Sequence, residues 1–223
     1  MGTLYLVRHG QASFGADDYD RLSALGRQQS ERLGGYWRER GLRFDAVLCG
    51  TLRRHVQTLE GIGQGLGGLP EPLQLSGLNE YDSQALIHCI HPAPLPRPDT
   101  PERYRQHFRL LCDALAQWMA GTIGPAGMPG WDGFADGVRL VLDLVRRQHP
   151  GQNVLLVTSG GPIATAVGLV LSTPPEVTIA LNMRIRNSAV TEFSVNPKRL
   201  MLQTFNTVAH LDGPGHAGWV THA

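Results

Sequence analysis

The chain of 223 residues is long enough for one sizeable hydrophobic core and short for two, so we expect a single domain over residues 1–223. Hydrophobic residues make up 42% of the sequence and charged residues 17%, as in an ordinary soluble globule. The formal net charge of +1 gives no bulk attraction to nucleic acid or to an acidic membrane surface. Any preference for anions must therefore come from local clusters of basic residues.

The cysteines and the apolar stretches indicate a cytoplasmic protein. The three cysteines are odd in number and far apart, which favours free thiols in a reducing compartment. They are Cys49, Cys89 and Cys112. Arg8 and His9 interrupt the first apolar run too early for a signal peptide. The longest apolar stretch, Val154 to Leu171, is broken by a Ser-Gly-Gly-Pro turn, so it does not predict a membrane span.

Strands and helices alternate in the first part of the chain. A polar loop, Gln11 to Asp20, follows the first strand, and Ser23 is suited to cap the first helix. The apolar runs and their stop signals predict a strand over Leu4–Val7, a helix over Ala24–Arg40, a strand over Asp45–Cys49, a helix ending near Gly65, and a short extended piece over Leu73–Leu78.

The amino-acid composition changes at the start of the second part of the chain. Residues 83–151 carry a proline-rich stretch, two helical patterns and a loop rich in glycine, and they predict a helical insertion. The patterns predict helices over Glu102–Met119 and Gly133–Gln148, a central strand over Asn153–Thr158, a helix over Ile163–Leu171, and a hairpin of Ala189–Val195 with Leu200–Phe205. The tail, residues 212–223, has no pattern that demands order.

This alternation predicts a three-layer α/β/α sandwich around a mostly parallel sheet. Parallel strands bring their carboxyl ends to one edge, where open α/β sheets place their ligands. Polar residues follow four of these ends, namely Arg8-His9-Gly10, the turn leading to Arg54, the segment ending in Glu80, and Ser159-Gly160-Gly161.

The residue types at this edge suit a phosphoryl group. Ser159 and Gly160 open a helix, whose free N–H groups and dipole attract an anion. Arg8 and Arg54 supply guanidinium forks that match phosphate oxygens. An imidazole among them can act as a nucleophile, while a carboxyl on a neighbouring loop protonates the leaving oxygen.

Several other polar residues lie near these motifs. Asp82 follows Glu80 closely enough to compete with it for the role of proton donor. We interpret His55, His88 and His91 as structural or surface residues, because a His-x-x-His pair with one cysteine is a poor metal site without further ligands. We therefore expect neither a metal nor an organic cofactor.

Taken together, the motifs resemble a known family. Leu4-Tyr-Leu-Val-Arg8-His9-Gly10 resembles the signature of the histidine phosphatase superfamily, also called phosphoglycerate mutase-like. Leu52-Arg53-Arg54-His55-Val56-Gln57-Thr58 is similar to its Leu-x-Arg-x-x-Gln-Thr motif, and Leu78-Asn79-Glu80 stands where its acidic loop would be. The order and spacing of the motifs agree over nearly the whole chain.

The resemblance implies hydrolysis of a small phosphomonoester through a phosphohistidine on His9. It implies that Arg8 and Arg54 hold the phosphoryl oxygens, with Glu80 as proton donor and then as base for water. Gln11 and Ser13 would line the substrate pocket. The oligomeric state is left open.

Ser159 departs from this resemblance. The family normally has a second histidine, followed by glycine, at the end of the corresponding strand. Losing a preorganised donor of that kind costs about 10²–10³ in rate. The alternative to a phosphatase is therefore a weak or inactive protein that binds phosphorylated ligands.

Two further activities are less favoured. Thr158-Ser159-Gly160-Gly161 partly mimics the nucleophile elbow of a serine esterase, with Glu192 and His210 following in the expected order. Val157 stands at the first glycine position of that elbow, where little room is left. A phosphoglycerate-type mutase is disfavoured because Gln11 to Asp20 does not resemble the substrate loop of the glycolytic mutases.

Overall fold

A six-stranded sheet with the order β3-β2-β4-β1-β5-β6 organises the chain, for which a computed structural model describes residues 2–13, 20–96 and 99–222. Neighbouring pairs among the first four strands of this order are parallel. The sheet continues with β5, which is antiparallel to β1, and with β6, which is antiparallel to β5. The strands are β1 (Gly2–Arg8), β2 (Ala46–Cys49), β3 (Pro72–Gln74), β4 (Asn153–Thr158), β5 (Val190–Asn196) and β6 (Arg199–Thr207). The prediction of a mostly parallel sheet is confirmed. The expected loop Gln11 to Asp20 lies partly outside the described residues.

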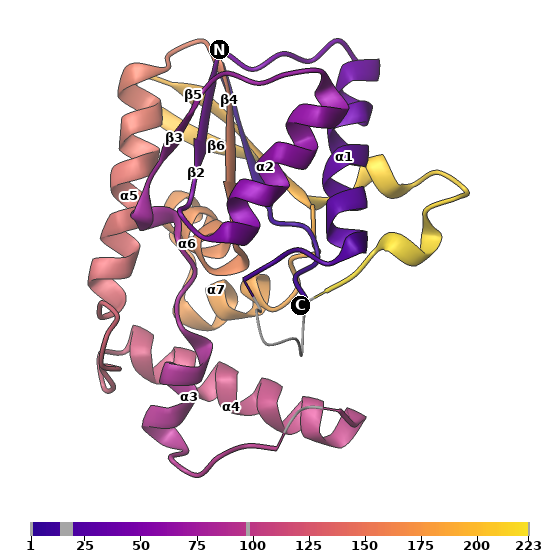
Figure 1. Ribbon diagram of the computed structural model, residues 1–223. Coiled ribbons are helices and arrows are strands. Elements are labelled where there is room, and N and C mark those ends of the chain that lie inside the picture. Colours follow the sequence, from indigo (N-terminus) through magenta and orange to yellow (C-terminus); the bar gives the residue numbers. More distant parts are fainter. Residues whose placement is uncertain (1, 14–19, 97–98, 223) are drawn as a thin grey trace.

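Helices cover both faces of the sheet (Figure 1). One face packs against α1 (Ala24–Glu39) and α2 (Arg53–Leu66), and the other packs against α5 (Trp131–Gln148) and α6 (Gly160–Leu171). Side chains of β4 alternate between the two cores, since Val154 and Leu156 join the core with α5 and α6, and Leu155 and Val157 join the other. The predicted three-layer sandwich is therefore confirmed, and β4 is covered on both faces as its apolar run predicted.

Local sequence signals explain where the first helices begin and how closely they pack. Ser23 caps α1 as predicted, because its side chain accepts a hydrogen bond from Gly26 N–H. A Cβ built on Gly34 would lie 2.1 Å from the carbonyl oxygen of Ile62, so only glycine allows α1 and α2 to approach this closely.

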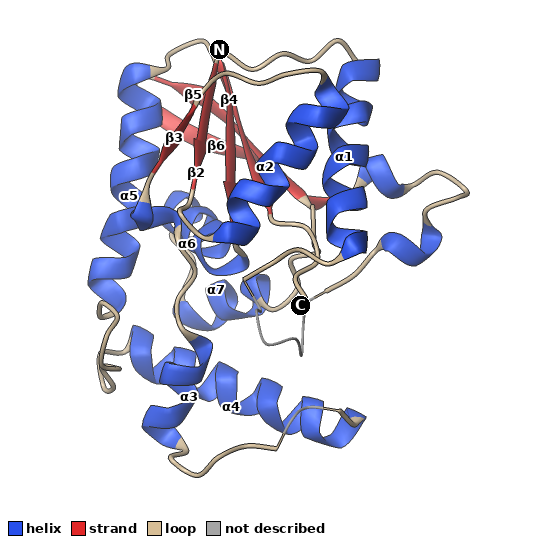
Figure 2. Cartoon of the chain, viewed as in Figure 1, coloured by secondary structure: helices blue, strands red, loops and turns tan. Residues whose placement is uncertain are grey.

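Two further helices lie beyond the carboxyl edge of the sheet, namely α3 (Ser83–Ile90) and α4 (Pro101–Met119) (Figure 2). The insertion pattern did not predict α3, whose first turn is capped by the Asp82 carboxylate. Side chains from α3, α4 and the start of α5 form a third core that includes Leu86, Trp118 and Phe134. The rest of α5 packs on the sheet, so the part of the expected insertion that leaves the sandwich contains α3 and α4.

The structure differs from two other predictions. The extended piece over Leu73–Leu78 is wrong in its second half, because the partner strand β2 ends at Cys49, opposite Gln74, and the chain then forms the 3₁₀ helix η1 (Ser76–Leu78). The patterns also missed α7 (Pro175–Asn182), which packs against α6 and begins with a proline at a position where a missing N–H costs nothing.

The C-terminal segment makes specific hydrogen bonds although its sequence shows no ordering pattern. It contains the 3₁₀ helices η2 (Ala209–Leu211) and η3 (Ala217–Trp219). The Gln29 amide donates to the carbonyl oxygen of Trp219 at 2.6 Å and to Thr221 at 3.0 Å. These bonds tie residues near the C-terminus to α1.

The cysteines occur as free thiols, and Cys49 is buried, as its apolar run predicted. Within the described ranges, no helix is both long and apolar enough to cross a membrane.

Candidate active site

His9 lies at the end of β1, beside the end of β4. Its N–H donates to the carbonyl oxygen of Thr158 at 2.9 Å, which brings His9 next to Ser159. The His9 side chain is buried, and its Nδ1 lies 2.8 Å from the carbonyl oxygen of Gly10. Because a carbonyl oxygen only accepts, Nδ1 must carry the hydrogen. The lone pair of the neutral ring is therefore on Nε2.

The surroundings of His9 favour this neutral form. Burial lowers the pKa of His9 well below 6.5, and the positive charges of Arg8 and Arg54 lower it further. The imidazole therefore stays unprotonated at neutral pH, as a nucleophile requires.

Arg8 and Arg54 flank both His9 and Glu80. Both arginines are only 7% exposed, and both act electrostatically on the two other side chains. The guanidinium of Arg8 donates to the carbonyl oxygen of Ile185, and that of Arg54 forms an ion pair with Asp20 at 2.7 Å. Two buried cations thus face the imidazole from the end of β1 and the start of α2.

The Glu80 carboxyl lies at the N-terminus of α6. Gly161 N–H is 3.1 Å from each carboxyl oxygen of Glu80. Burial raises the pKa of Glu80, although this N–H and the charges of Arg54 and Arg8 act in the opposite direction. Asp82, the competing carboxyl, instead accepts from Gln84 and Ala85 as the cap of α3. Glu80 is therefore the carboxyl that the fold brings near His9.

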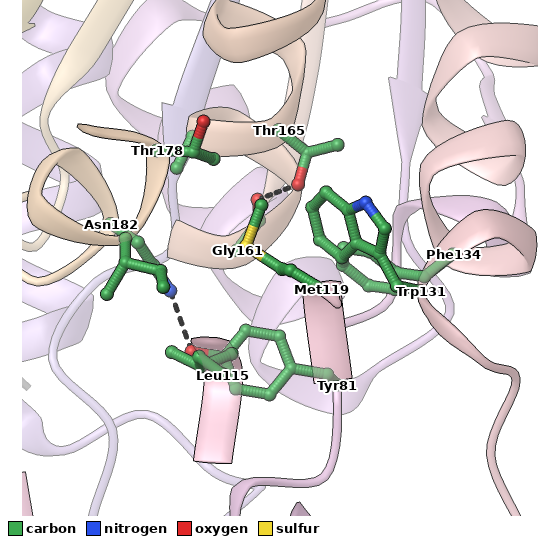
Figure 3. A pocket seen from close by; sticks show the side chains of 11 residues that line it. Tyr81, Leu115, Met119, Trp131, Phe134, Gly161, Thr165, Thr178 and Asn182 are labelled. Atoms are coloured by element: carbon green, nitrogen blue, oxygen red, sulfur yellow. Dashed lines mark hydrogen bonds between the residues drawn. The ribbon is translucent and has the colours of Figure 1, made fainter. Parts of the chain in front are cut away.

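Glycine is required where α6 meets Glu80. A Cβ on Gly161 would lie 2.1 Å from Oε1 of Glu80 and 2.6 Å from the Tyr81 ring. Figure 3 shows the side chains around Gly161, where Thr165 donates to the Gly161 carbonyl oxygen and Asn182 donates to the Tyr81 hydroxyl. The cavity among them measures about 10 Å³, room for no more than one water molecule. The wall behind Glu80 is thus closely packed.

Ser159 is the N-cap of α6 and Gly160 is its first residue, so both open the helix as predicted. Ser159 has an unexpected partner. Its Oγ lies 2.7 Å from Nε2 of His55, and both side chains are fully buried. The rings of His55 and His9 are 5.8 Å apart between centroids. The interpretation of His55 as a structural or surface residue therefore missed its proximity to the site.

The sequence does contain a pattern that indicates where His55 lies. His55 follows Arg54 directly, and it precedes Thr58 by three residues, so the two share a face of α2. The Thr58 hydroxyl accepts from Gly10 N–H at 3.0 Å, which shows that this face meets the end of β1.

The predicted pocket residues Gln11 and Ser13 are held mainly by bonds to neighbouring segments. Gln11 N–H donates to the Gln29 side chain, and Ser23 donates to the Gln11 side chain at 2.8 Å. Ser13 N–H donates to the carbonyl oxygen of Arg21. Both are partly exposed, and their contact with substrate stays a prediction.

The esterase triad is not assembled. His210 Nε2 lies 2.8 Å from Ser188 Oγ, whereas Ser159 is paired with His55. The less favoured serine-esterase alternative, in which His210 would serve Ser159, is therefore not supported by the structure. His88 is exposed, and His91 bonds to the carbonyl oxygen of Ala93. In the described part of the chain, no three histidine, cysteine or acidic side chains cluster as metal ligands would.

Solved structures share this fold at low sequence identity. Phosphoserine phosphatase from Entamoeba histolytica, solved with 3-phosphoglyceric acid, is 19% identical with a TM-score of 0.65, over 95% of this chain and 100% of that one. Bacillus stearothermophilus YhfR is 21% identical with a TM-score of 0.68, over 94% and 99% of the two chains. Phosphoglycerate mutase from Bacillus anthracis is 16% identical with a TM-score of 0.66, over 93% and 94%.

Comparison with curated proteins gives no match. The model of the histidine phosphatase superfamily (branch 1) matches residues 4–208, a span that holds every residue of the site described above. The chain therefore belongs to the histidine phosphatase superfamily.

Proposed function

We propose that the protein hydrolyses a small phosphomonoester through a phosphohistidine formed on His9. The observation that carries this proposal is the state of the His9 ring. Its Nδ1–H is engaged by the Gly10 carbonyl, so the buried Nε2 lone pair remains for attack, with Arg8 and Arg54 beside it.

In the first step, His9 Nε2 attacks the phosphorus atom and the bond to the leaving oxygen breaks. Glu80 gives its proton to that oxygen, for which its raised pKa prepares it. The Arg8 and Arg54 guanidinium groups bind the other phosphoryl oxygens and offset the charge in the transition state.

In the second step, the Glu80 carboxylate takes a proton from water while the water oxygen attacks phosphorus. The P–N bond breaks, and its electron pair returns to Nε2 of His9. The sum of the two steps is an alcohol and inorganic phosphate from a phosphomonoester and water, and no cofactor is consumed.

The substrate class is proposed from the charge of the site together with the structural relatives. The E. histolytica enzyme was solved with 3-phosphoglyceric acid, a small phosphorylated acid. We propose a substrate of that size here, and hydrolysis in preference to transfer, because the segment after Gly10 lacks the pattern of the glycolytic mutases.

A panel of small phosphomonoesters and one aryl phosphate tests this function by release of inorganic phosphate. We expect turnover that His9→Ala abolishes, with the variant still folded by circular dichroism. Turnover that survives in His9→Ala would refute the mechanism. Vanadate binding without turnover of any ester would instead favour the pseudophosphatase alternative.

A further inference from the structure

His55 and Ser159 form a buried hydrogen-bonded pair that the two-step mechanism above does not use. The Nε2–Oγ distance is 2.7 Å, and neither side chain is exposed. The pair joins the first turn of α2 to the N-cap of α6, next to the His9 ring. Burying two polar side chains together is costly unless each is hydrogen-bonded, which makes the direction of their bond important.

The surroundings of His55 decide which of its nitrogens carries the hydrogen. Nδ1 is buried and has no hydrogen-bond partner among the described residues. A Cβ on Gly50 would lie 2.2 Å from Nδ1, so the Cα–H that it would replace crowds this nitrogen. That contact suits a lone pair and opposes an N–H. A buried N–H without an acceptor is also rarer than an unpaired acceptor.

The hydrogen of the neutral ring therefore belongs on Nε2. Burial and the charge of Arg54 lower the pKa of His55 to about 3, which keeps the ring neutral at ordinary pH. In this tautomer Nε2–H donates to Ser159 Oγ, and the oxygen uses a lone pair to accept. The hydroxyl hydrogen of Ser159 is then available to another acceptor.

We propose, building on the proposed phosphatase function, that His55 is a positioning residue that turns the Ser159 hydroxyl into a donor for the phosphoryl oxygens at His9. Ser159 is the N-cap of α6, whose dipole favours the same anion, while Gly161 N–H in the first turn donates to Glu80. His55 acts through Ser159 and supplies an uncharged donor at the end of β4. The opposite tautomer would make His55 a base for a serine nucleophile.

Vanadate affinity measures this arrangement without requiring turnover. A donor bond to a charged group is worth about 1.5–3 kcal/mol, so Ser159→Ala should weaken vanadate binding about 10-fold to 100-fold in titration calorimetry. His55→Leu should weaken it similarly, and the double variant no more than the stronger single one. Effects that multiply, or single variants that bind like wild type, would overturn the proposal.

Two further variants separate positioning from general damage. His55→Gln offers an amide N–H at the reach of Nε2 and should recover part of the affinity that His55→Leu loses. His210→Leu removes a second buried Ser–His bond, of 2.8 Å to Ser188, and should lower stability while leaving vanadate affinity unchanged. An equal loss of affinity in His55→Gln and His55→Leu would show that His55 only fills space, and would refute the proposal.

Nitrogen-15 NMR of the histidine rings tests the tautomer directly. We expect a protonated Nε2 and a bare Nδ1 on His55, with no titration between pH 5 and 9 because the pKa is about 3. A protonated Nδ1, or labelling of Ser159 by a fluorophosphonate probe, would refute the proposal in favour of a nucleophilic serine. Vanadate binding without ester hydrolysis would refute only the phosphatase function.

Discussion

The substitution Glu80→Gln tests how the two chemical steps share one carboxyl. The amide oxygen that replaces a carboxyl oxygen can still accept from Gly161 N–H, which lies 3.1 Å from the Glu80 side chain, so the new side chain should keep its place. Only the proton transfer is lost. General acid–base catalysis contributes about 10²–10⁴-fold, and we expect kcat on an alkyl phosphate to fall by that factor.

An aryl phosphate should respond differently. Its leaving group needs little protonation, so Glu80→Gln should still form phospho-His9, but hydrolysis of that intermediate lacks its base. The assay compares kcat on both esters and measures the phosphoenzyme after alkaline quenching. We expect the intermediate to accumulate in Glu80→Gln on the aryl ester. Asp82→Asn is the matched control, because Asp82 caps α3 and should leave both rates unchanged. Equal, small losses on the two esters would refute the role of Glu80.

The pH profile follows from the same groups, and the remaining predictions concern packing and acid stability. Because burial raises the pKa of Glu80, kcat/KM should fall as pH rises through that pKa, where the carboxyl has no proton to give, and a wholly flat alkaline limb would contradict this. Gly161→Ala should cost activity more than stability, since the new Cβ would lie 2.1 Å from Glu80 Oε1; unchanged kcat would contradict the assigned geometry. Gly34→Ala should destabilise the fold by about 1–3 kcal/mol or more by overpacking against Ile62, measured by urea unfolding, and a neutral variant would contradict the close approach of α1 and α2. The pKa of His210 is lowered by burial from 6.5 to about 3, so its contribution to stability is present above pH 6.5 and is lost as pH falls toward 3. In that window His210→Gln should reduce the slope of unfolding free energy against pH by about 1.4 kcal/mol per pH unit, and an unchanged slope would show that His210 titrates normally.

The sequence predicted those parts of the fold that depend on local patterns. The unbroken run Val154 to Val157 predicted a strand covered on both faces, and Ser23 predicted the start of α1; both are confirmed. The extended piece over Leu73–Leu78 failed because the length of β3 is limited by where its partner β2 ends. That limit is a property of the assembled sheet.

In the site, too, the sequence predicted what depends on local patterns and missed what depends on the assembled fold. Strand ends predicted that His9, Glu80, Arg54 and Ser159 would meet at one edge, and the structure brings them together. The sequence could not decide between Glu80 and Asp82, because the choice depends on α3, which had no clear pattern. The spacing of His55 and Thr58 indicates which face of α2 carries His55, but the pairing with Ser159 joins residues 104 positions apart, and no local pattern predicts that contact.

The chemical state of His9 is the most direct test of the mechanism. Wild-type protein is mixed with an aryl phosphate, quenched at alkaline pH within the first turnover, and mapped by peptide mass spectrometry and phosphorus NMR. We expect one phosphoryl group on Nε2 of His9, which disappears on longer incubation and never forms in His9→Ala. Hydrolysis without any phosphorylated His9, at a rate that His9→Ala does not change, would contradict the account.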